Sequence, residues 1–344
     1  MHKVAGRPPL RYILNMPEQV RARALGAFYG LALGDALGMP TQSMSRTRIK
    51  DRYGSITTLV DASPDQPIAP GMPAGSVTDD TEQAVLVAKL LIDGNGRIDP
   101  YTFADALRAW EADMTSRGSR DLLGPSTKRA LEHLDAGLTP QQAGVTGTTN
   151  GAAMRVTPVA IANPVGDRLL DAVISASVVT HNTSLGIAAA SAIAAAVSAS
   201  IDGADLSTAL DEAEHAAHSG ARRSNWVPGG EVAPRIRWAR EWVRGMSRGA
   251  LADAVAEVVG TSVAAQESVV AAIALAEVSA DDPLDSLLLA AQIGGDTDTI
   301  AAILGAILGA QHGVAGLPAD LVGKVREVNG LDLDPLVDGL LTLR

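Results

Sequence analysis

The sequence contains no cysteine, and this absence excludes several kinds of chemistry. A chain without cysteine has no disulfide, no thiolate nucleophile and no zinc–thiolate site. Aromatic residues make up only 3% of the 344 residues, so a core must be built from Ala, Val, Leu and Ile. With 34 glycines among them, such small side chains favour closely packed helices. Hydrophobic residues at 47% and charged residues at 19% exclude an intrinsically disordered chain.

Positive charge is also in deficit. The chain has 28 Lys and Arg against 39 Asp and Glu, which gives a formal net charge of −11. An acidic chain is a poor general partner for nucleic acid or for an anionic membrane surface, so we expect neither as a partner. The same charge balance is compatible with a site that holds cations.

Long apolar runs are scarce as well. The N-terminal residues 1–23 contain no apolar stretch of signal-peptide length, so we expect a cytoplasmic protein. The one uncharged stretch of membrane-spanning length, Ser184–Ile201, consists mostly of Ala and Ser. That composition favours a buried helix over a bilayer span.

What the sequence does have is helical periodicity, which predicts an all-α fold. We see no internal repeat and no composition break typical of a linker, so we expect one domain over residues 1–344, with its motifs in residues 20–315. Four prolines between Pro40 and Gly75 exclude a long helix there. Helices are expected at Val20–Gly38, Asp80–Ile92, Pro100–Ala112, Ser126–Asp135, Asp167–Val179, Ser184–Ile201, Ala204–His218, Ala233–Met246, Leu251–Val259, Gln266–Ala276, Pro283–Ala291 and Thr297–Gln311.

The first of these helices carries a glycine at every fourth position, namely Gly26, Gly30, Gly34 and Gly38. Residues four apart share one helix face, so this stripe has no side chains. It therefore predicts that another backbone lies closely against the helix.

Residues 222–248 combine seven Arg with three of the four Trp. Interleaved Arg and Trp can bind single-stranded nucleic acid. However, Trp238 and Trp242 lie four apart on one helix face, and Glu241 is available to pair with Arg237. In an acidic chain this pattern favours a packed amphipathic helix, or a role beside an anionic ligand, over nucleic-acid binding.

Two short acidic motifs stand at the starts of apolar helices: GSVTDDTE at residues 75–82 and GGDTDT at residues 294–299. The simpler hypothesis is capping, because Asp and Thr at a helix start accept backbone N–H bonds and Glu82 stands where a capping box has its acid. One carboxylate per helix would suffice for capping, whereas each start carries at least two carboxylates and two hydroxyls. No Lys or Arg lies close in sequence to either motif.

A hard divalent cation would resolve this crowding of negative charge, because buried anions repel one another unless a cation lies between them. Carboxylate, hydroxyl and backbone oxygens without His or Cys suit Mg²⁺, Mn²⁺ or Ca²⁺ rather than zinc. The second motif is not an EF-hand, since Ile307 occupies the position where a Glu should stand. The residues alone leave two alternatives open: capping, or two helix starts that face each other and share metal.

Five segments, in this order, resemble the ADP-ribosylglycohydrolase family, which includes the enzyme that removes ADP-ribose from dinitrogenase reductase. They are GLALGDALGMP (30–40), SVTDDTEQAVLVA (76–88), NGAAMRVTP (150–158), THNTSLG with His181, and GGDTDTIAAILGAILGA (294–310). The resemblance implies an all-α orthogonal multi-helix bundle with a binuclear Mg²⁺ centre in a central cleft, with Mn²⁺ as an alternative. It also implies hydrolysis of the glycosidic bond between ADP-ribose and an acceptor.

The resemblance extends to individual site residues. It implies a metal-binding set of Thr78, Asp79, Asp80, Asp296, Asp298 and Thr299. We expect Asp80 and Asp298 to be the catalytic residues that act on a metal-bound water. It implies a substrate-binding set of Asn150, Gly151 and Met154, in the loop that cradles ADP-ribose, and His181 near the phosphates. Asp35, alone in the glycine-striped helix, is expected to be a buried acid bonded to backbone that orients the site.

Gln42 departs from the family pattern. The family usually has a glutamate seven residues beyond the Asp of GDALG, and Gln42 stands there. Glutamine keeps the shape and the hydrogen bonding but takes up no proton. Either another acid transfers the proton, or the substrate differs from ADP-ribosylated protein. Two functions are therefore alternatives to an ADP-ribosyl glycohydrolase: a nucleosidase-like hydrolase of a small N-riboside, and a non-catalytic ADP-ribose-binding relative. The intact acids of both motifs argue against the non-catalytic one.

Overall fold

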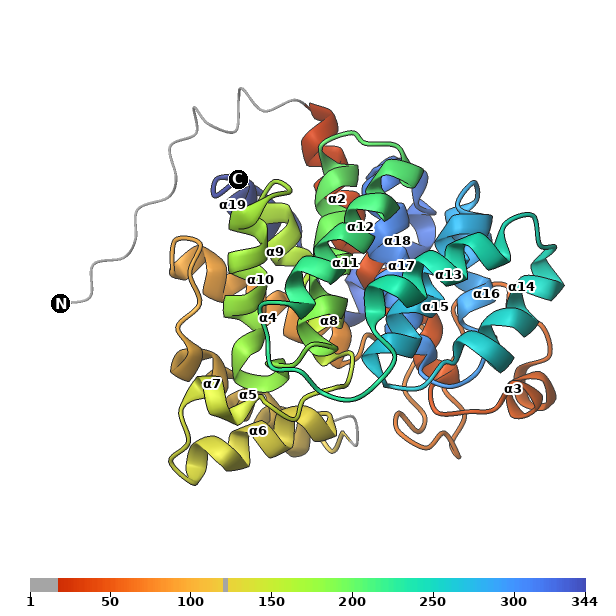
Figure 1. The fold of residues 1–344 in the computed structure, drawn as a ribbon. Coiled ribbons are helices and arrows are strands. Elements are labelled where there is room, and N and C mark those ends of the chain that lie inside the picture. The colour runs from red at the N-terminus through yellow and green to blue at the C-terminus, as the bar shows by residue number, and fades with distance from the viewer. Residues whose placement is uncertain (1–17, 120–122) are drawn as a thin grey trace.

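The computed structural model describes residues 18–119 and 123–344, and this part of the chain is built from helices (Figure 1). Within the described residues there is no β-strand, only three isolated bridges between single residues. The all-α prediction is therefore confirmed.

The helices follow one another with short connections. The first half of the chain forms α2 (Glu18–Gly38), η1 (Met39–Thr41), α3 (Arg46–Tyr53), α4 (Asp79–Asp93), α5 (Pro100–Ser116), α6 (Pro125–Asp135), α7 (Pro140–Ala143), α8 (Gly151–Met154), α9 (Thr157–Ala162) and α10 (Asp167–His181). The second half forms α11 (Gly186–Ile201), α12 (Leu206–Ala221), α13 (Val232–Val243), α14 (Arg248–Ala254), the π-helical η2 (Val255–Val259), α15 (Ala265–Ser279), α16 (Pro283–Ala290), α17 (Thr297–His312), η3 (Val314–Gly316), α18 (Ala319–Asn329) and α19 (Asp334–Leu341).

Each expected helix is present, with ends that differ by a few residues, except that the helix expected at Leu251–Val259 is divided between α14 and the π-helical η2. The sequence did not predict α3, α7, α8, α9, α18 and α19. Several of these carry little helical periodicity: α7 and α8 span four residues each, and α3 buries only Ile49. Such elements have too few apolar positions to show a period.

The glycine stripe of α2 packs against α17, which confirms the predicted close approach of another backbone. A Cβ built on Gly30 would lie 2.1 Å from the carbonyl oxygen of Gly305, and one on Gly34 would lie 2.0 Å from that of Ala301. The helices run antiparallel, because Gly26 faces Gly309 at one end and Gly38 faces Thr297 at the other. This packing places the second acidic motif, where α17 begins, beside the C-terminal end of α2.

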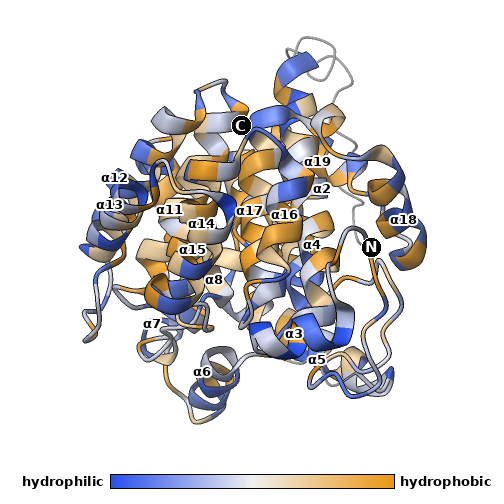
Figure 2. Cartoon of the chain, turned by 90° about the vertical axis from the view of Figure 1, so that its right-hand side faces the viewer, coloured by the Kyte–Doolittle hydropathy of each residue, from blue (hydrophilic) through white to orange (hydrophobic). Residues whose placement is uncertain are grey.

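Helix α11 lies inside the molecule, and every one of its residues from Gly186 to Ile201 is buried. The prediction of a buried helix at Ser184–Ile201 is thus confirmed. Figure 2 shows the apolar residues gathered on the central helices and the hydrophilic ones toward the outside, for example on α12 and α13. Among the described residues, no helix combines the length and apolar character that a membrane crossing requires.

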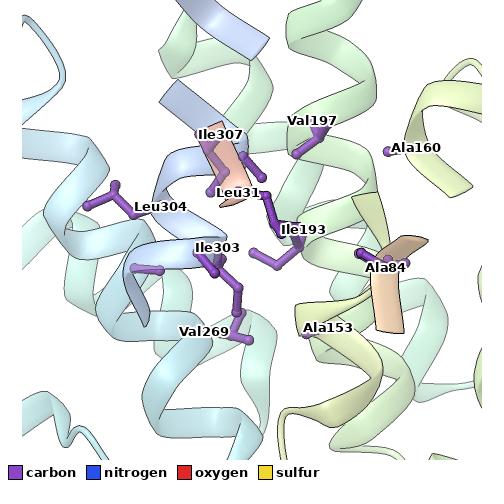
Figure 3. Packing of buried hydrophobic residues seen from close by; sticks show 14 of the residues in the cluster. Leu31, Ala84, Ala153, Ala160, Ile193, Val197, Val269, Ile303, Leu304 and Ile307 are labelled. Atoms are coloured by element: carbon purple, nitrogen blue, oxygen red, sulfur yellow. The ribbon is translucent and has the colours of Figure 1, made fainter. Parts of the chain in front are cut away.

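One hydrophobic core supports the helices that carry the site (Figure 3). Leu31 of α2, Ile193 of α11 and Ile303 of α17 converge at its centre. Ala84 of α4 and Ala153 of α8 belong to the same cluster, and both lie a few residues from predicted site residues. The helices that carry the predicted site residues are therefore held in place by shared packing.

Helix α13 differs from its predicted packing. Trp238 and Trp242 stack with ring centroids 5.2 Å apart, yet they stay 38% and 37% exposed. Arg240 is buried instead, with its guanidinium 2.7 Å from carboxylates of both Asp211 and Glu277. Two carboxylates compensate the cost of burying this cation, which the sequence pattern did not reveal.

Candidate active site

The two acidic motifs meet in the folded chain. Thr299 Oγ1, in the first turn of α17, donates a hydrogen bond to Asp80 Oδ2 in the first turn of α4 at 3.2 Å. Asp80 is fully buried and Asp298 is 3% exposed. Two helix starts separated by 219 residues thus face each other, as the shared-site hypothesis requires.

Capping is not the role of these motifs. Thr78 and Asp296 are the N-cap residues of α4 and α17, but neither side chain caps its own helix. Glu82 forms no capping box, because its carboxylate accepts from Trp110 Nε1 at 2.6 Å and from Arg117 at 3.1 Å. The side chains of Thr78, Asp296 and Glu82 therefore do not cap these two helices.

Asp35 of α2 caps α4 from outside that helix. It accepts hydrogen bonds from the backbone N–H groups of Thr78 at 3.0 Å and Thr81 at 3.1 Å, and from the hydroxyls of the same residues at 2.7 and 2.5 Å. Asp35 is thus a buried acid bonded to backbone, as predicted. Burial raises the pKa of Asp35 to about 6, although these four donors act in the opposite direction. Because Asp35 caps α4, the Asp80 side chain is not needed as a cap and faces the second motif.

Asp80 lies at the centre of the negative charge. Its Oδ1 atom is buried and makes no hydrogen bond within the described residues. Burial raises the pKa of Asp80 well above its ordinary value, and the charges of Asp79, Asp298, Asp35 and Asp296 raise it further. A buried carboxylate oxygen without a partner, among other carboxylates, is the arrangement that a cation would neutralise.

The loop around Asn150 joins the acids to the predicted substrate residues. Asn150 Nδ2 donates to Asp296 Oδ2 at 2.5 Å and to Ser268 Oγ at 2.9 Å. Burial raises the pKa of Asp296 to about 6, while the hydrogen bond from Asn150 acts in the opposite direction. The expected small-residue turn is the single helical turn α8, which contains Gly151 and the buried Met154.

Gly151 packs against the predicted histidine. A Cβ at this position would lie 2.9 Å from Cε1 of His181, so only a glycine leaves room for the ring. His181 is fully buried, and its Nε2 lies 2.9 Å from Thr149 Oγ1. Burial, and next the charge of Arg155, hold the pKa of His181 well below its ordinary value. The ring is therefore neutral at physiological pH.

Gln42 lies in a segment tied to the second acidic motif. Ser43 N donates to Gly295 O at 2.7 Å, and Gly295 N donates to Met44 O at 2.9 Å. Gln42 itself is 5% exposed, and its Nε2 makes no hydrogen bond within the described residues. A buried amide donor next to the acidic site is thus left without an acceptor among the residues that the structure describes.

Sequence reasoning missed Arg155 as a site residue. The residue is 2% exposed, and it donates to Gln83 Oε1 at 2.7 Å. Gln83 in turn donates to Asp79 Oδ2 at 3.1 Å. No basic residue is close to the acids in sequence, but this one is close in space, and the charge of Asp79 acts on its pKa. The sequence did contain a signal for a buried functional residue, namely a charged side chain within the mostly apolar run from Ala152 to Ala162.

Comparison with known proteins supports the resemblance seen in the motifs. The model of the family described as ADP-ribosylglycohydrolase matches residues 16–344. An uncharacterized protein of Escherichia coli, YegU, is 34% identical over 94% of this chain and 97% of its own length. The ADP-ribosyl-[dinitrogen reductase] glycohydrolase of Rhodospirillum rubrum is 27% identical, covering 94% and 97% of the two chains. A solved structure described as an ADP-ribosylglycohydrolase-related protein complex superposes with a TM-score of 0.68 at 26% identity, over 95% of this chain and 99% of that one.

Proposed function

The chain belongs to the ADP-ribosylglycohydrolase family, whose members are glycoside hydrolases, and we propose that it cleaves the bond between ADP-ribose and an acceptor with the help of Mg²⁺. The observation that carries this proposal is the buried Asp80 Oδ1, which makes no hydrogen bond within the described residues and faces the carboxylates of a second helix start. The acceptor is a protein side chain or a small conjugate.

The donor set fits a hard cation by its chemistry, since it consists of carboxylate and hydroxyl oxygens. The ligands would be Thr78, Asp79, Asp80, Asp296, Asp298 and Thr299. Within the described residues, no three acidic or histidine side chains converge as a ready-made metal cluster. When bound, Mg²⁺ or Mn²⁺ would supply Lewis-acid activation of water and hold the ribose hydroxyls.

Individual residues of the chain account for orientation, proton transfer and stabilisation of the transition state. Asn150 orients the Asp296 carboxylate through its 2.5 Å hydrogen bond. Asp80 or Asp298, both buried, accepts the proton of the attacking water. Burial and the neighbouring acids raise the pKa of Asp80, which makes its carboxylate a stronger base than an exposed one. The transition state of glycoside hydrolysis carries positive charge at the sugar, and the clustered carboxylates stabilise that charge.

A hydrolysis panel tests the proposal. We expect the full chain with Mg²⁺ to release ADP-ribose from ADP-ribosyl-arginine or ADP-ribosyl-serine, and to lose this activity with EDTA. Mg²⁺ together with ADP-ribose should also raise the melting temperature, since a ligand that binds only the folded state stabilises it. Cleavage of simple nucleosides without cleavage of ADP-ribosyl conjugates would favour the nucleosidase alternative, which Gln42 in place of the family glutamate supports. Thermal stabilisation by ADP-ribose without any hydrolysis would identify a binding protein.

Gln42 should contribute by positioning the substrate. Gln42→Ala should lower kcat/KM about tenfold, because it removes one hydrogen bond to the substrate. Gln42→Glu should improve hydrolysis of ADP-ribosyl conjugates if the native substrate is something else, and should lower it if the site is adapted to glutamine. The measurement is kcat/KM of the wild type and both variants on an ADP-ribosyl conjugate and on a nucleoside. A loss of about a thousandfold or more in Gln42→Ala would instead identify a principal catalytic group.

A further inference from the structure

Arg155 stands in the middle of a buried chain of hydrogen bonds behind the acidic site. One of its nitrogens donates to Gln83 Oε1 and another donates to Thr180 Oγ1, both at 2.7 Å. Its guanidinium also lies over the ring of Phe103, 5.0 Å from the centroid. No carboxylate among the described residues forms an ion pair with it. A buried arginine held by neutral partners is costly, and a specific task would account for it.

The chain continues from Thr180 to the substrate loop. Thr180 Oγ1 lies 2.8 Å from His181 Nδ1. On the other side of the ring, His181 Nε2 lies 2.9 Å from Thr149 Oγ1. The next residue, Asn150, holds the Asp296 carboxylate. The histidine therefore connects a buried cation on one side with the loop beside the acids on the other.

The donors and acceptors in this chain determine which ring nitrogen carries the proton. Arg155 has only donors, so the Thr180 oxygen must accept from it. The Thr180 hydroxyl proton then has one acceptor within hydrogen-bond distance in the described residues, the Nδ1 atom of His181. The opposite tautomer would leave that buried hydroxyl proton unpaired, which is unfavourable. Since the ring is neutral, its single proton lies on Nε2 and is donated to Thr149.

We propose that Arg155 and Thr180 are positioning residues that hold His181 as the Nε2–H tautomer, so that the ring always donates to Thr149 in the substrate loop. The catalytic consequence of this proposal rests on the proposed function. The tautomer itself does not depend on any activity. The Thr149 hydroxyl, fixed as an acceptor from the ring, then keeps its own proton for a partner other than His181. Because Thr149 precedes Asn150 in the substrate loop, a substrate oxygen bound beside it would find a donor.

Histidine ¹⁵N NMR of the labelled full chain tests the proposal, with a His181→Gln variant to assign the resonance among the six histidines. We expect His181 of the wild type at pH 7 to be neutral, with an unprotonated Nδ1 and a protonated Nε2. In Thr180→Val and Arg155→Met this single-tautomer signature should be lost, and Thr180→Ser should restore it. An Nδ1–H tautomer or an imidazolium in the wild type would overturn the proposal, and so would a Thr180→Val spectrum identical to that of the wild type.

Kinetics supply the second measurement, with a matched control on the same helix. Ser177 of α10 is 1% exposed, and its hydroxyl makes no hydrogen bond within the described residues. Ser177→Ala therefore removes a buried hydroxyl outside the chain, and it should change neither the tautomer nor kcat/KM. Thr180→Val should lower kcat/KM on an ADP-ribosyl conjugate about tenfold, and Thr180→Ser should recover it. Equal losses in Ser177→Ala and Thr180→Val would contradict the positioning role. If the wild type proves inactive, the proposed function fails while the NMR result still decides the tautomer.

Discussion

An Asp80→Asn variant should lose hydrolysis of ADP-ribosyl conjugates by about a thousandfold or more, while its metal-free form becomes harder to unfold than the wild type. The activity is lost because Asn supplies neither the charge that would hold the ion nor a group that takes up a proton. The gain in stability follows from the crowding of acids around a fully buried carboxylate.

The direction of the stability change follows from the pKa of Asp80. Burial and four neighbouring acids raise this pKa well above its ordinary value. A group whose pKa is higher in the folded state than in the unfolded state opposes folding once the pH is high enough to ionise it. At neutral pH the neutral amide removes that opposition, so the metal-free variant should melt at a higher temperature. Added Mg²⁺ should stabilise the wild type and leave the variant unchanged.

The control for this experiment is Asp93→Asn, which lies at the exposed C-terminal end of the same helix. This variant should keep wild-type activity and the response to Mg²⁺. The measurements are kcat/KM and melting temperatures with EDTA and with Mg²⁺. An Asp80→Asn protein that keeps its activity, or that is still stabilised by Mg²⁺, would exclude Asp80 from the proposed metal site.

Gly34→Ala should destabilise the fold by about 3 kcal/mol, the upper end of what overpacking usually costs. The new Cβ would lie 2.0 Å from the carbonyl oxygen of Ala301 and 2.4 Å from its carbonyl carbon. Both atoms belong to the backbone of α17, so no side chain can move aside and the two helices must separate. Their separation would also displace the start of α17, so activity should fall under conditions in which the protein is still folded.

Gly323→Ala in α18 is the matched control. It is also a helical glycine, but a Cβ at this position would meet no atom within 4 Å. Alanine has the higher helix propensity, so this variant should gain up to about 1 kcal/mol. Urea unfolding of both variants provides the comparison. If Gly34→Ala were as stable as the wild type, the close packing of α2 on α17 would be wrong.

The sequence was sufficient to predict the fold class, because helical periodicity and the glycine stripe are properties of residues three and four positions apart. It showed that α2 needs a close neighbour, but it did not identify α17. That choice depends on complementary small residues, Gly305 and Gly309, which meet the stripe only in the folded chain. Short helices such as α3 and α8 were missed because they have too few apolar positions to establish a period.

The candidate site shows the same division between local and long-range information. Motifs within single segments singled out Asp80, Asn150, His181 and Asp298, since each motif is local in sequence. Only the tertiary structure decided how these residues are used. Asp35 caps a helix whose N-cap residue, Thr78, lies 43 residues later, so the acids of that helix are not needed as caps. Arg155 reaches Gln83 across 72 residues, and Gln83 bonds to Asp79, so a buried positive charge lies near the acids in space although none is near them in sequence. Such contacts depend on how whole helices pack, and the residues adjacent in the chain do not determine that packing.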